Sequence, residues 1–295
     1  MGKKSRKSTA DVIAKRKARA ASAAFVARPF EGLPFEADLV CFKELVPAAT
    51  ATAKLNEENG GTEITFASLL PGGAQAMHRQ DGVVFAGMQT PFSSPDPSRD
   101  VAAAILKAKD AEPGAIVNAT TNPGEGPRLQ DILDLDAPFS VTVQEGFDYW
   151  IAPGQAEGEE AEQLAEALEQ ANTRVHPTEK LVSASGAYWT RMGEKVFVRW
   201  ARTEHEETVV DALARLHAAG ENTFGGAGRF LGTFRAHGIT VPVWELDAGS
   251  QPDDAEEPLA AFAKDFDAAL AETTPLSAQE RSARAGVASR QLTIR

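Results

Sequence analysis

The chain has 295 residues, of which 43% are apolar, and carries a formal net charge of −12. This length suits one large domain or two small ones with a sizeable core. No apolar run approaches the ~18 residues of a membrane span, and the single cysteine, Cys41, excludes an internal disulfide or a metal site with several cysteine ligands. We therefore expect a soluble, cytoplasmic protein, with Cys41 as a small buried hydrophobe.

The first nineteen residues contrast in charge with everything that follows them. They hold eight Lys or Arg and one Asp, a charge of +7, whereas the rest of the chain holds 22 basic and 41 acidic residues, a charge of −19. Residues 1–8 have no apolar periodicity, and an Ala-rich helix is predicted over about 9–27, ended by Pro29 and Pro34. The cations of this basic arm are Lys3, Lys4, Arg6, Lys7, Lys15, Arg16, Lys17 and Arg19.

The arm has the composition of a segment that follows phosphates. The four cations of its predicted helix spread over roughly 200° at about 100° per residue, and the opposite face is mainly Ala, which disfavours an interfacial membrane helix. The acidic remainder would be repelled by an extended polyanion, because charges are screened only beyond about 8–10 Å. We expect the arm to contact RNA at a localised surface such as the ribosome. An anionic membrane, a translocase, or a solvated tail without a partner are the alternatives.

The middle of the chain predicts an α+β fold. A short buried helix is expected at 36–46, and then a pattern of two strands and a helix recurs three times, each time with Gly beside an acidic residue at the predicted turn. Such units predict a largely antiparallel sheet built from ββα-like units with helices on one face, whether or not they are a true repeat. The units are 63–70, 83–88 and 99–110; 139–143, 147–151 and 159–171; and 187–190, 195–200 and 205–219.

The last quarter of the chain predicts a helix at 228–237 and an edge strand at 239–244, because Pro242 cannot donate to a ladder. Two helices follow, the last of them capped by Ser277. From 281 to 295 there are four Arg and no acid, a possible second contact. The domain organisation is then a basic arm at 1–28, an α+β core at 29–246, an acidic linker at 247–257 and C-terminal helices at 258–295.

No residue pattern predicts catalysis. The five histidines stand in no metal or catalytic spacing, and no nucleophile elbow is present, so we expect no catalytic residue, metal or cofactor. The enzyme alternative is a nucleotide- or phosphate-handling activity, because backbone N–H groups of Gly225, Gly226 and Gly228 beside Arg229 could bind an anion at the start of the predicted helix.

A second RNA hypothesis concerns the third predicted hairpin. There, Trp189, Phe197 and Trp200 are interleaved with cations, as in sheets that stack on single-stranded RNA. Strand alternation, however, sends half of such side chains into a core. The expectation is therefore a binding protein whose arm contacts RNA, with its oligomeric state open.

Three segments resemble a known family of roughly this length. They are Arg28-Pro-Phe-Glu-Gly-Leu33, Glu36-Ala-Asp-Leu-Val40 and Glu44-Leu-Val-Pro-Ala-Ala-Thr-Ala51, preceded by Lys3-Lys-Ser-Arg6. Together they are similar to an actinobacterial domain-of-unknown-function family, whose members often carry labels such as preprotein translocase subunit or topoisomerase. The resemblance implies no catalytic residues. The sequence has neither a Walker motif nor a cysteine-rich zinc tail to support the translocase label. A topoisomerase would need a nucleophilic tyrosine, whereas both tyrosines, Tyr149 and Tyr188, fall in predicted core strands.

Overall fold

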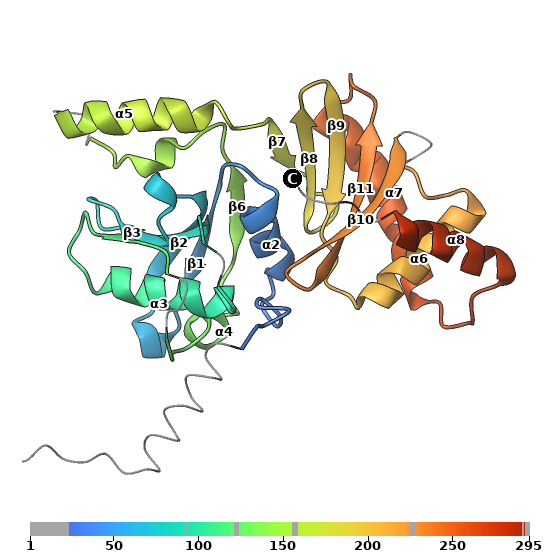
Figure 1. Cartoon of the computed structure of the whole chain (residues 1–295), viewed down its shortest axis with the longest axis horizontal. Coiled ribbons are helices and arrows are strands. Elements are labelled where there is room, and N and C mark those ends of the chain that lie inside the picture. Colours follow the sequence, from blue (N-terminus) through green and yellow to red (C-terminus); the bar gives the residue numbers. More distant parts are fainter. Residues whose placement is uncertain are drawn as a thin grey trace, which may run out of the picture.

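A computed structural model describes residues 24–92, 94–120, 124–154, 159–224, 228–290 and 292. Two sheets form two lobes, and helix α2 (Glu36–Glu44) lies between them (Figure 1). Most strand pairs are antiparallel, which confirms the predicted α+β class.

The first lobe contains a six-stranded sheet in the order β5-β3-β4-β2-β1-β6. Its one parallel pair joins β2 to β4, and every other neighbouring pair in it is antiparallel. The strands are β1 (Ala49–Lys54), β2 (Glu63–Leu69), β3 (Ala76–His78), β4 (Val84–Gln89), β5 (Ile116–Val117) and β6 (Ser140–Val143).

Helices cover both faces of this sheet. On one face α2 and α3 (Pro97–Lys109) pack on alternate apolar residues such as Phe66 and Ala86, next to the short α4 (Leu129–Ile132). On the other face, Phe85 packs with residues of the 3₁₀ turn η3 (Asp148–Trp150) and of α5 (Glu159–Asn172). Two further 3₁₀ turns, η1 (Glu57–Asn59) and η2 (Pro71–Gly73), connect strands.

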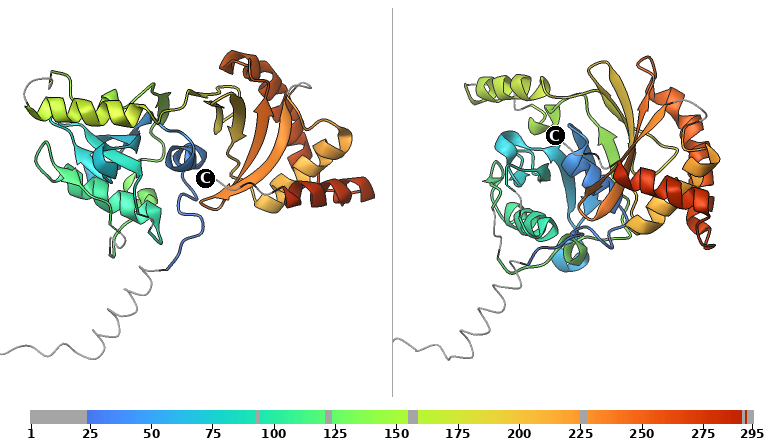
Figure 2. Two further views of the ribbon diagram at one scale, coloured as in Figure 1. Left: turned by 45° about the horizontal axis from the view of Figure 1, so that its top comes forward. Right: turned by 45° about the vertical axis from the view of Figure 1, so that its right-hand side comes forward.

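The second lobe contains a five-stranded antiparallel sheet in the order β10-β11-β9-β8-β7. Its outer face is covered by three helices, over a core rich in Trp and Phe (Figure 2). The strands are β7 (Thr178–Lys180), β8 (Ala187–Met192), β9 (Lys195–Trp200), β10 (Arg229–Ala236) and β11 (Ile239–Leu246). The helices are α6 (Glu206–Ala219), α7 (Pro252–Ala271) and α8 (Ala278–Ser289).

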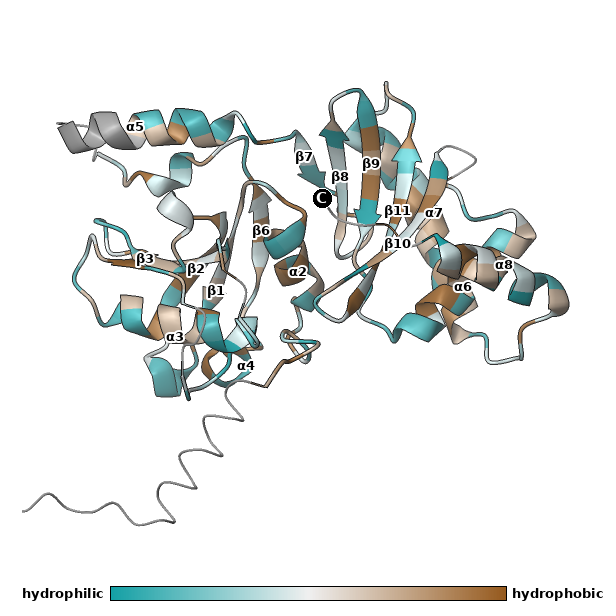
Figure 3. Cartoon of the chain, viewed as in Figure 1, coloured by the Kyte–Doolittle hydropathy of each residue, from teal (hydrophilic) through white to brown (hydrophobic). Residues whose placement is uncertain are grey.

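Helix α2 belongs to the cores of both lobes. Its residues Leu39, Val40 and Cys41 are fully buried in one cluster with residues of both sheets, among them Phe66 and Val241. Figure 3 shows apolar residues on α2, between the lobes, and on β9 of the second sheet. Cys41 is therefore a packing residue, as predicted, and burial raises the pKa of its thiol.

Polar side chains also join the lobes. Asp38 of α2 accepts hydrogen bonds from Tyr188 Oη (2.7 Å) and Lys180 Nζ (2.8 Å) of the second lobe. Arg28 forms a two-pronged contact with Glu36, at 2.7 Å for each prong, and donates to Thr203 O. Charge-assisted pairs of this kind fix orientation as well as adding stability.

The hairpins of the first lobe differ from the prediction. The strand at 83–88 exists as β4, but it pairs in parallel with β2 and forms its hairpin with the short β3. Residues 147–151 are the turn η3 and not a strand, because Tyr149 Oη and Trp150 Nε1 both donate to Leu69 O (2.8 Å each) and fold the segment under β2.

The predicted helix at 228–237 is also wrong. The segment is β10, which forms a hairpin with β11 around His237 and Gly238, both with positive φ (47° and 83°). β11 is not an edge strand, because it lies between β10 and β9. Pro242 instead interrupts the ladder between β11 and β9: strand pairing begins at Val243, and on the other side of the proline an isolated bridge joins Thr240 to Arg202.

Two predictions at the ends of the body also need adjustment. Helix α7 begins at Pro252, inside the segment expected as a linker, because its first-turn acids complement the helix dipole. Most of the helix predicted at 9–27 lies outside the described residues, and residues 24–27 are not helical.

Candidate functional site

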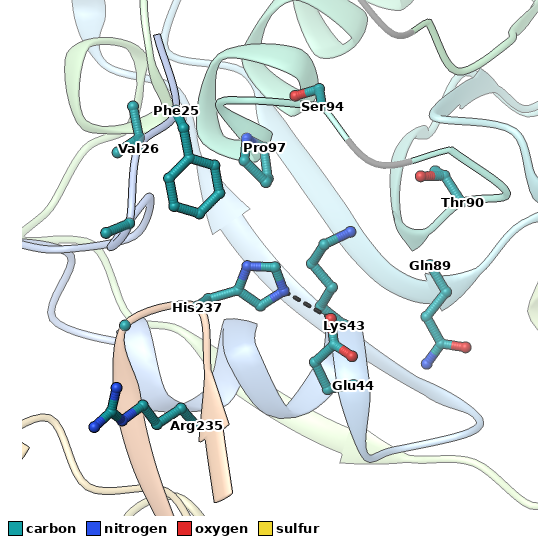
Figure 4. A pocket seen from close by; sticks show the side chains of 12 residues that line it. Phe25, Val26, Lys43, Glu44, Gln89, Thr90, Ser94, Pro97, Arg235 and His237 are labelled. Atoms are coloured by element: carbon teal, nitrogen blue, oxygen red, sulfur yellow. Dashed lines mark hydrogen bonds and ion pairs between the residues drawn. The ribbon is translucent and has the colours of Figure 1, made fainter. Parts of the chain in front are cut away.

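A cleft lies between the two lobes, beside the C-terminal end of α2. It consists of two hollows of about 570 and 590 Å³. Lys43, Glu44 and Gln89 line both of them, so the two hollows meet at the last turn of α2. Figure 4 shows the first hollow, with Phe25 and His237 on the side opposite Gln89.

Side chains beside the cleft donate hydrogen bonds to carbonyl groups at the C-terminal end of α2. The Gln89 side chain at the end of β4 donates to Phe42 O (2.7 Å) and to Val46 O (2.8 Å). Arg199 donates to Leu45 O (3.3 Å). These donors satisfy carbonyl groups that a helix C-terminus leaves without partners, and they place a cation at its negative end.

Arg199 is the central side chain of the second hollow. On β9, residues 196, 198 and 200 face the helices of the second lobe, so Arg199 faces α2 and the cleft. Its guanidinium donates to the Thr190 hydroxyl (2.6 Å) and to Leu45 O, both neutral, while Nε is enclosed and has no hydrogen-bond partner among the described residues. Within the described ranges no carboxylate pairs with it, and burial lowers its pKa to about 10, which leaves it a cation at neutral pH.

Lys43 is a second cation of the cleft, and no carboxylate in the described part of the chain forms an ion pair with it. Its Nζ donates to Met88 O (3.0 Å), and burial lowers its pKa, an effect that the nearby charges of Glu44 and Asp100 partly offset. The adjacent Glu44 is engaged by His237 Nε2 (2.7 Å), as the dashed line in Figure 4 marks. The carboxylate nearest in sequence to Lys43 is therefore already satisfied from the other lobe.

Most of the remaining lining of the second hollow is apolar, although His176 also lines it. Its wall is formed by side chains of β9, β10, β11 and the end of the chain: Phe197, Leu231, Phe234, Val243 and Leu292. A cavity of a few hundred Å³ with an apolar wall and a few convergent polar groups is typical of small-molecule sites. The arrangement suits a molecule with an anionic head and an apolar body.

The site residues predicted from the sequence lie elsewhere. The eight cations of the basic arm, together with Gly225 and Gly226, are outside the described residues. Gly228 and Arg229 are described, but Arg229 begins a strand and donates to Glu245 Oε2 (2.6 Å), so the helix terminus expected beside it does not exist. Anion binding by this loop stays a prediction.

The hypothesis of an RNA-facing sheet is wrong. Trp189 and Trp200 are 3% and 1% exposed, and they pack in the core under the helices of the second lobe. The cations beside them, Arg191 and Arg202, lie over these rings and not over a free surface.

Sequence reasoning missed both cations of the cleft. Arg199 appeared only as one cation of the third hairpin, and Lys43 only as part of a buried helix. The signal that could have identified Arg199 was the alternation of side chains along a strand, because Arg199 lies on the opposite face of β9 from Val198 and Trp200.

Comparisons with known proteins give a family and nothing more specific. A family model matches residues 29–295, and its description is that of a family of unknown function. No curated protein and no solved structure matches the chain. In the part of the chain that the structure describes, no helix is both long and apolar enough to cross a membrane, and no cluster of His, Cys, Asp and Glu could hold a metal ion.

Proposed function

This chain belongs to that family, DUF5926, and we propose that it is a binding protein that takes up a small organic anion in the cleft between its lobes. One observation carries the proposal. Arg199 is partly buried and donates to two neutral oxygens, without a carboxylate partner among the described residues. A partly buried charge without a counter-ion is unfavourable, and an anion bound beside the guanidinium in the cleft would supply that counter-ion.

The chemistry of the wall narrows the class of ligand. A planar guanidinium matches the geometry of carboxylate and of phosphate, so either head group suits Arg199. The apolar side chains from Phe197 to Leu292 would contact a hydrocarbon or ring body. Lys43, at the junction of the two hollows, would add attraction for the same head group.

Titration with matched amphiphiles tests this proposal. We expect octanoate and octyl phosphate to bind, and octanol, which has the same body and no charge, to bind at least about tenfold more weakly, because a hydrogen bond to a charged group contributes roughly 1.5–3 kcal/mol. Isothermal titration calorimetry gives the three affinities, and the comparison of octanoate with octyl phosphate separates the two head groups. Equal affinity for octanol and octanoate would refute an anion site.

The basic arm supports a second function, contact with RNA. Its +7 charge contrasts with the −19 of the remaining chain, so attraction to a polyanion is confined to the arm. The chain just after it is fixed to the body: Val26 N donates to Pro95 O (2.8 Å), Arg28 holds Glu36, and Phe30 is fully buried. A ribosomal RNA surface in the cytoplasm fits a short arm of this kind.

Deleting residues 2–19 should abolish RNA binding. The full chain should lose affinity steeply between 50 and 200 mM salt, because log K falls by about 0.7–0.9 per phosphate contact for each tenfold rise in salt. Fluorescence anisotropy with labelled RNA measures both effects, and a chain with the eight arm cations changed to Gln is the matched control for length. Undiminished RNA binding by the deleted chain would contradict the proposal. Binding to vesicles of anionic lipid without binding to RNA would instead indicate a membrane partner.

A further inference from the structure

A histidine, His176, lines the second hollow together with Lys43 and Arg199. It lies in the segment between α5 and β7, and its side chain is exposed. No group in the described part of the chain forms a hydrogen bond with its ring, whereas its backbone carbonyl accepts one from Thr178. The imidazole is therefore available to a ligand in the hollow.

A chain of hydroxyl groups connects the backbone of His176 to Arg199. The Thr178 hydroxyl donates to His176 O (3.0 Å) and lies 3.2 Å from the Thr190 hydroxyl. The Thr190 oxygen in turn accepts from Arg199 (2.6 Å). Because a hydroxyl has a single proton and that of Thr178 is already used, the Thr190 proton is donated to Thr178. This chain fixes the position of His176 relative to Arg199, and it leaves neither hydroxyl with a proton for a ligand.

The donors that remain for a ligand come from three different elements. Lys43 Nζ has three protons and donates one to Met88 O. In Arg199, Nη2 makes the two hydrogen bonds to protein oxygens, and Nη1 makes none with the described residues. The imidazole of His176 has one N–H when it is neutral and two when it is protonated. Thus α2, β9 and the segment before β7 each contribute a free donor to one hollow.

We infer that the ligand of this hollow is a phosphate monoester with an apolar body, and that His176 is the residue that distinguishes the phosphate from a carboxylate. The inference rests on the proposed anion binding. A carboxylate has two oxygens in one plane, which the fork of Arg199 can satisfy alone. A phosphate monoester has three acceptor oxygens in a tetrahedral arrangement, so it can accept from Arg199, Lys43 and His176 together.

The charges around the hollow also favour a phosphate. Lys43 and Arg199 supply two positive charges. Glu44 is the one carboxylate among the described residues that line the hollow, and it is bonded to His237 on the side of the first hollow (Figure 4). Because the attraction to each cation is proportional to the charge of the ligand, a dianion gains more from this pair than a monoanion does.

Three octyl amphiphiles with different head groups test the inference. At pH 8 a phosphate monoester is a dianion, since its second pKa is about 6, whereas octanoate and octyl sulfate are monoanions. Octyl phosphate should bind at least about tenfold more tightly than octanoate, as expected for one further charge-assisted hydrogen bond, with tetrahedral octyl sulfate between them. Isothermal titration calorimetry gives the affinities. Equal or tighter binding of octanoate would overturn the inference and leave the anion site standing, whereas binding of none of the three would refute the anion site as well.

Substitution of His176 tests its role as the discriminating residue. His176→Ala should weaken binding of octyl phosphate at least about tenfold and of octanoate less than about twofold, which removes the preference for phosphate. His176→Gln keeps an N–H donor and should restore part of the loss. His205→Ala, an exposed histidine at the start of α6 and outside both hollows, is the matched control. An equal loss for both ligands, or no loss, would overturn the assignment.

Nuclear magnetic resonance detects the contact directly. In a chain labelled with ¹⁵N-histidine, the ring signals of His176, identified by their absence in His176→Gln, should shift on addition of octyl phosphate and stay in place with octanoate. Ring signals that do not respond to octyl phosphate would overturn the contact. Because the side chain of His176 is exposed and its structural hydrogen bond is made by the backbone, these variants should fold as the parent chain does.

Two further probes separate the sources of a phosphate group. Inorganic phosphate lacks the apolar body and should bind at least about tenfold more weakly than octyl phosphate, because it leaves the wall of the hollow uncovered. Vesicles of phosphatidic acid present the same head group on a membrane, and they should not displace octyl phosphate from a hollow of about 590 Å³. Equally tight binding of inorganic phosphate, or displacement by the vesicles, would overturn a soluble ligand with an apolar body.

Discussion

Replacing Arg199 with Leu should lower the affinity for octanoate about 10- to 150-fold, the equivalent of a charge-assisted hydrogen bond worth roughly 1.5–3 kcal/mol. The same substitution should leave the free energy of unfolding within about 1 kcal/mol of the wild-type value, because it removes a partly buried charge that has no carboxylate partner among the described residues. The Thr190 hydroxyl and Leu45 O lose a donor, which offsets part of that gain. Calorimetry measures the affinity, and urea denaturation measures the stability.

Two further variants make the Arg199 experiment specific. Arg199→Lys keeps the charge but loses the planar fork, so its affinity should lie between those of the wild type and Arg199→Leu. Arg191→Leu is the matched control on the neighbouring strand, since Arg191 donates to Ala248 O and Ser250 O outside the cleft. A large loss of stability in Arg199→Leu with unchanged affinity would assign this arginine a structural role and contradict the anion site.

Asp100→Asn should stabilise the protein at pH 7 by about 2 kcal/mol and should have no such effect near pH 4. Burial is the main cause that raises the pKa of Asp100 to about 6 from an ordinary value of 3.8, and the charge of Asp96 adds to it. Because the folded state holds this proton more tightly, the wild-type chain is most favoured below pH 3.8 and loses stability as the pH rises toward 6. The whole shift converts to about 3 kcal/mol at neutral pH, which the N-terminal dipole of α3 partly offsets.

Urea denaturation of both chains between pH 4 and 7.5 gives this difference directly. Asp110→Asn, at the exposed end of the same helix, is the matched control and should change the stability by less than about 0.5 kcal/mol at any pH. An Asp100→Asn difference that does not grow with pH would show that Asp100 is not held in this unfavourable ionised state.

Arg199 and Asp100 share one physical property. Both are charged groups kept in surroundings that disfavour their charge: Arg199 lines the cleft, and Asp100 lies near enough to its Lys43 to influence that pKa. Proteins retain such groups mainly where binding or chemistry needs them, and stability gained by their removal then accompanies lost function.

Local patterns in the sequence were sufficient for much of the fold. Apolar periodicity predicts the helices α3, α5 and α6, and Gly193 in the turn predicts the β8–β9 hairpin. The same reasoning failed at β10, where Phe230 and Phe234 also suit a helix. Their strand conformation comes from pairing with β11 across a His-Gly turn. Pairing partners are a tertiary property, which propensity does not contain.

The cleft lay further beyond sequence reasoning. Its cations come from α2 and β9, and Arg199 bonds Leu45 across a separation of 154 residues. The alternation of side chains along β9 does not indicate which element covers the face that carries Arg199. Only the packing of α2 against both sheets brings Lys43 and Arg199 to one hollow.

The position of α2 also sets an order of events during synthesis. The hydrogen bond from Tyr188 to Asp38 cannot form until Tyr188, 150 residues later in the chain, has been synthesised. Ribosomes add about 5–20 residues per second. For roughly 8–30 s the nascent first lobe therefore presents the second-lobe face of α2 without its covering sheet. Contacts of such long sequence separation form late and slow the final folding step. The junction that creates the cleft is thus an apolar surface that stays uncovered, and open to aggregation, while the chain is being made.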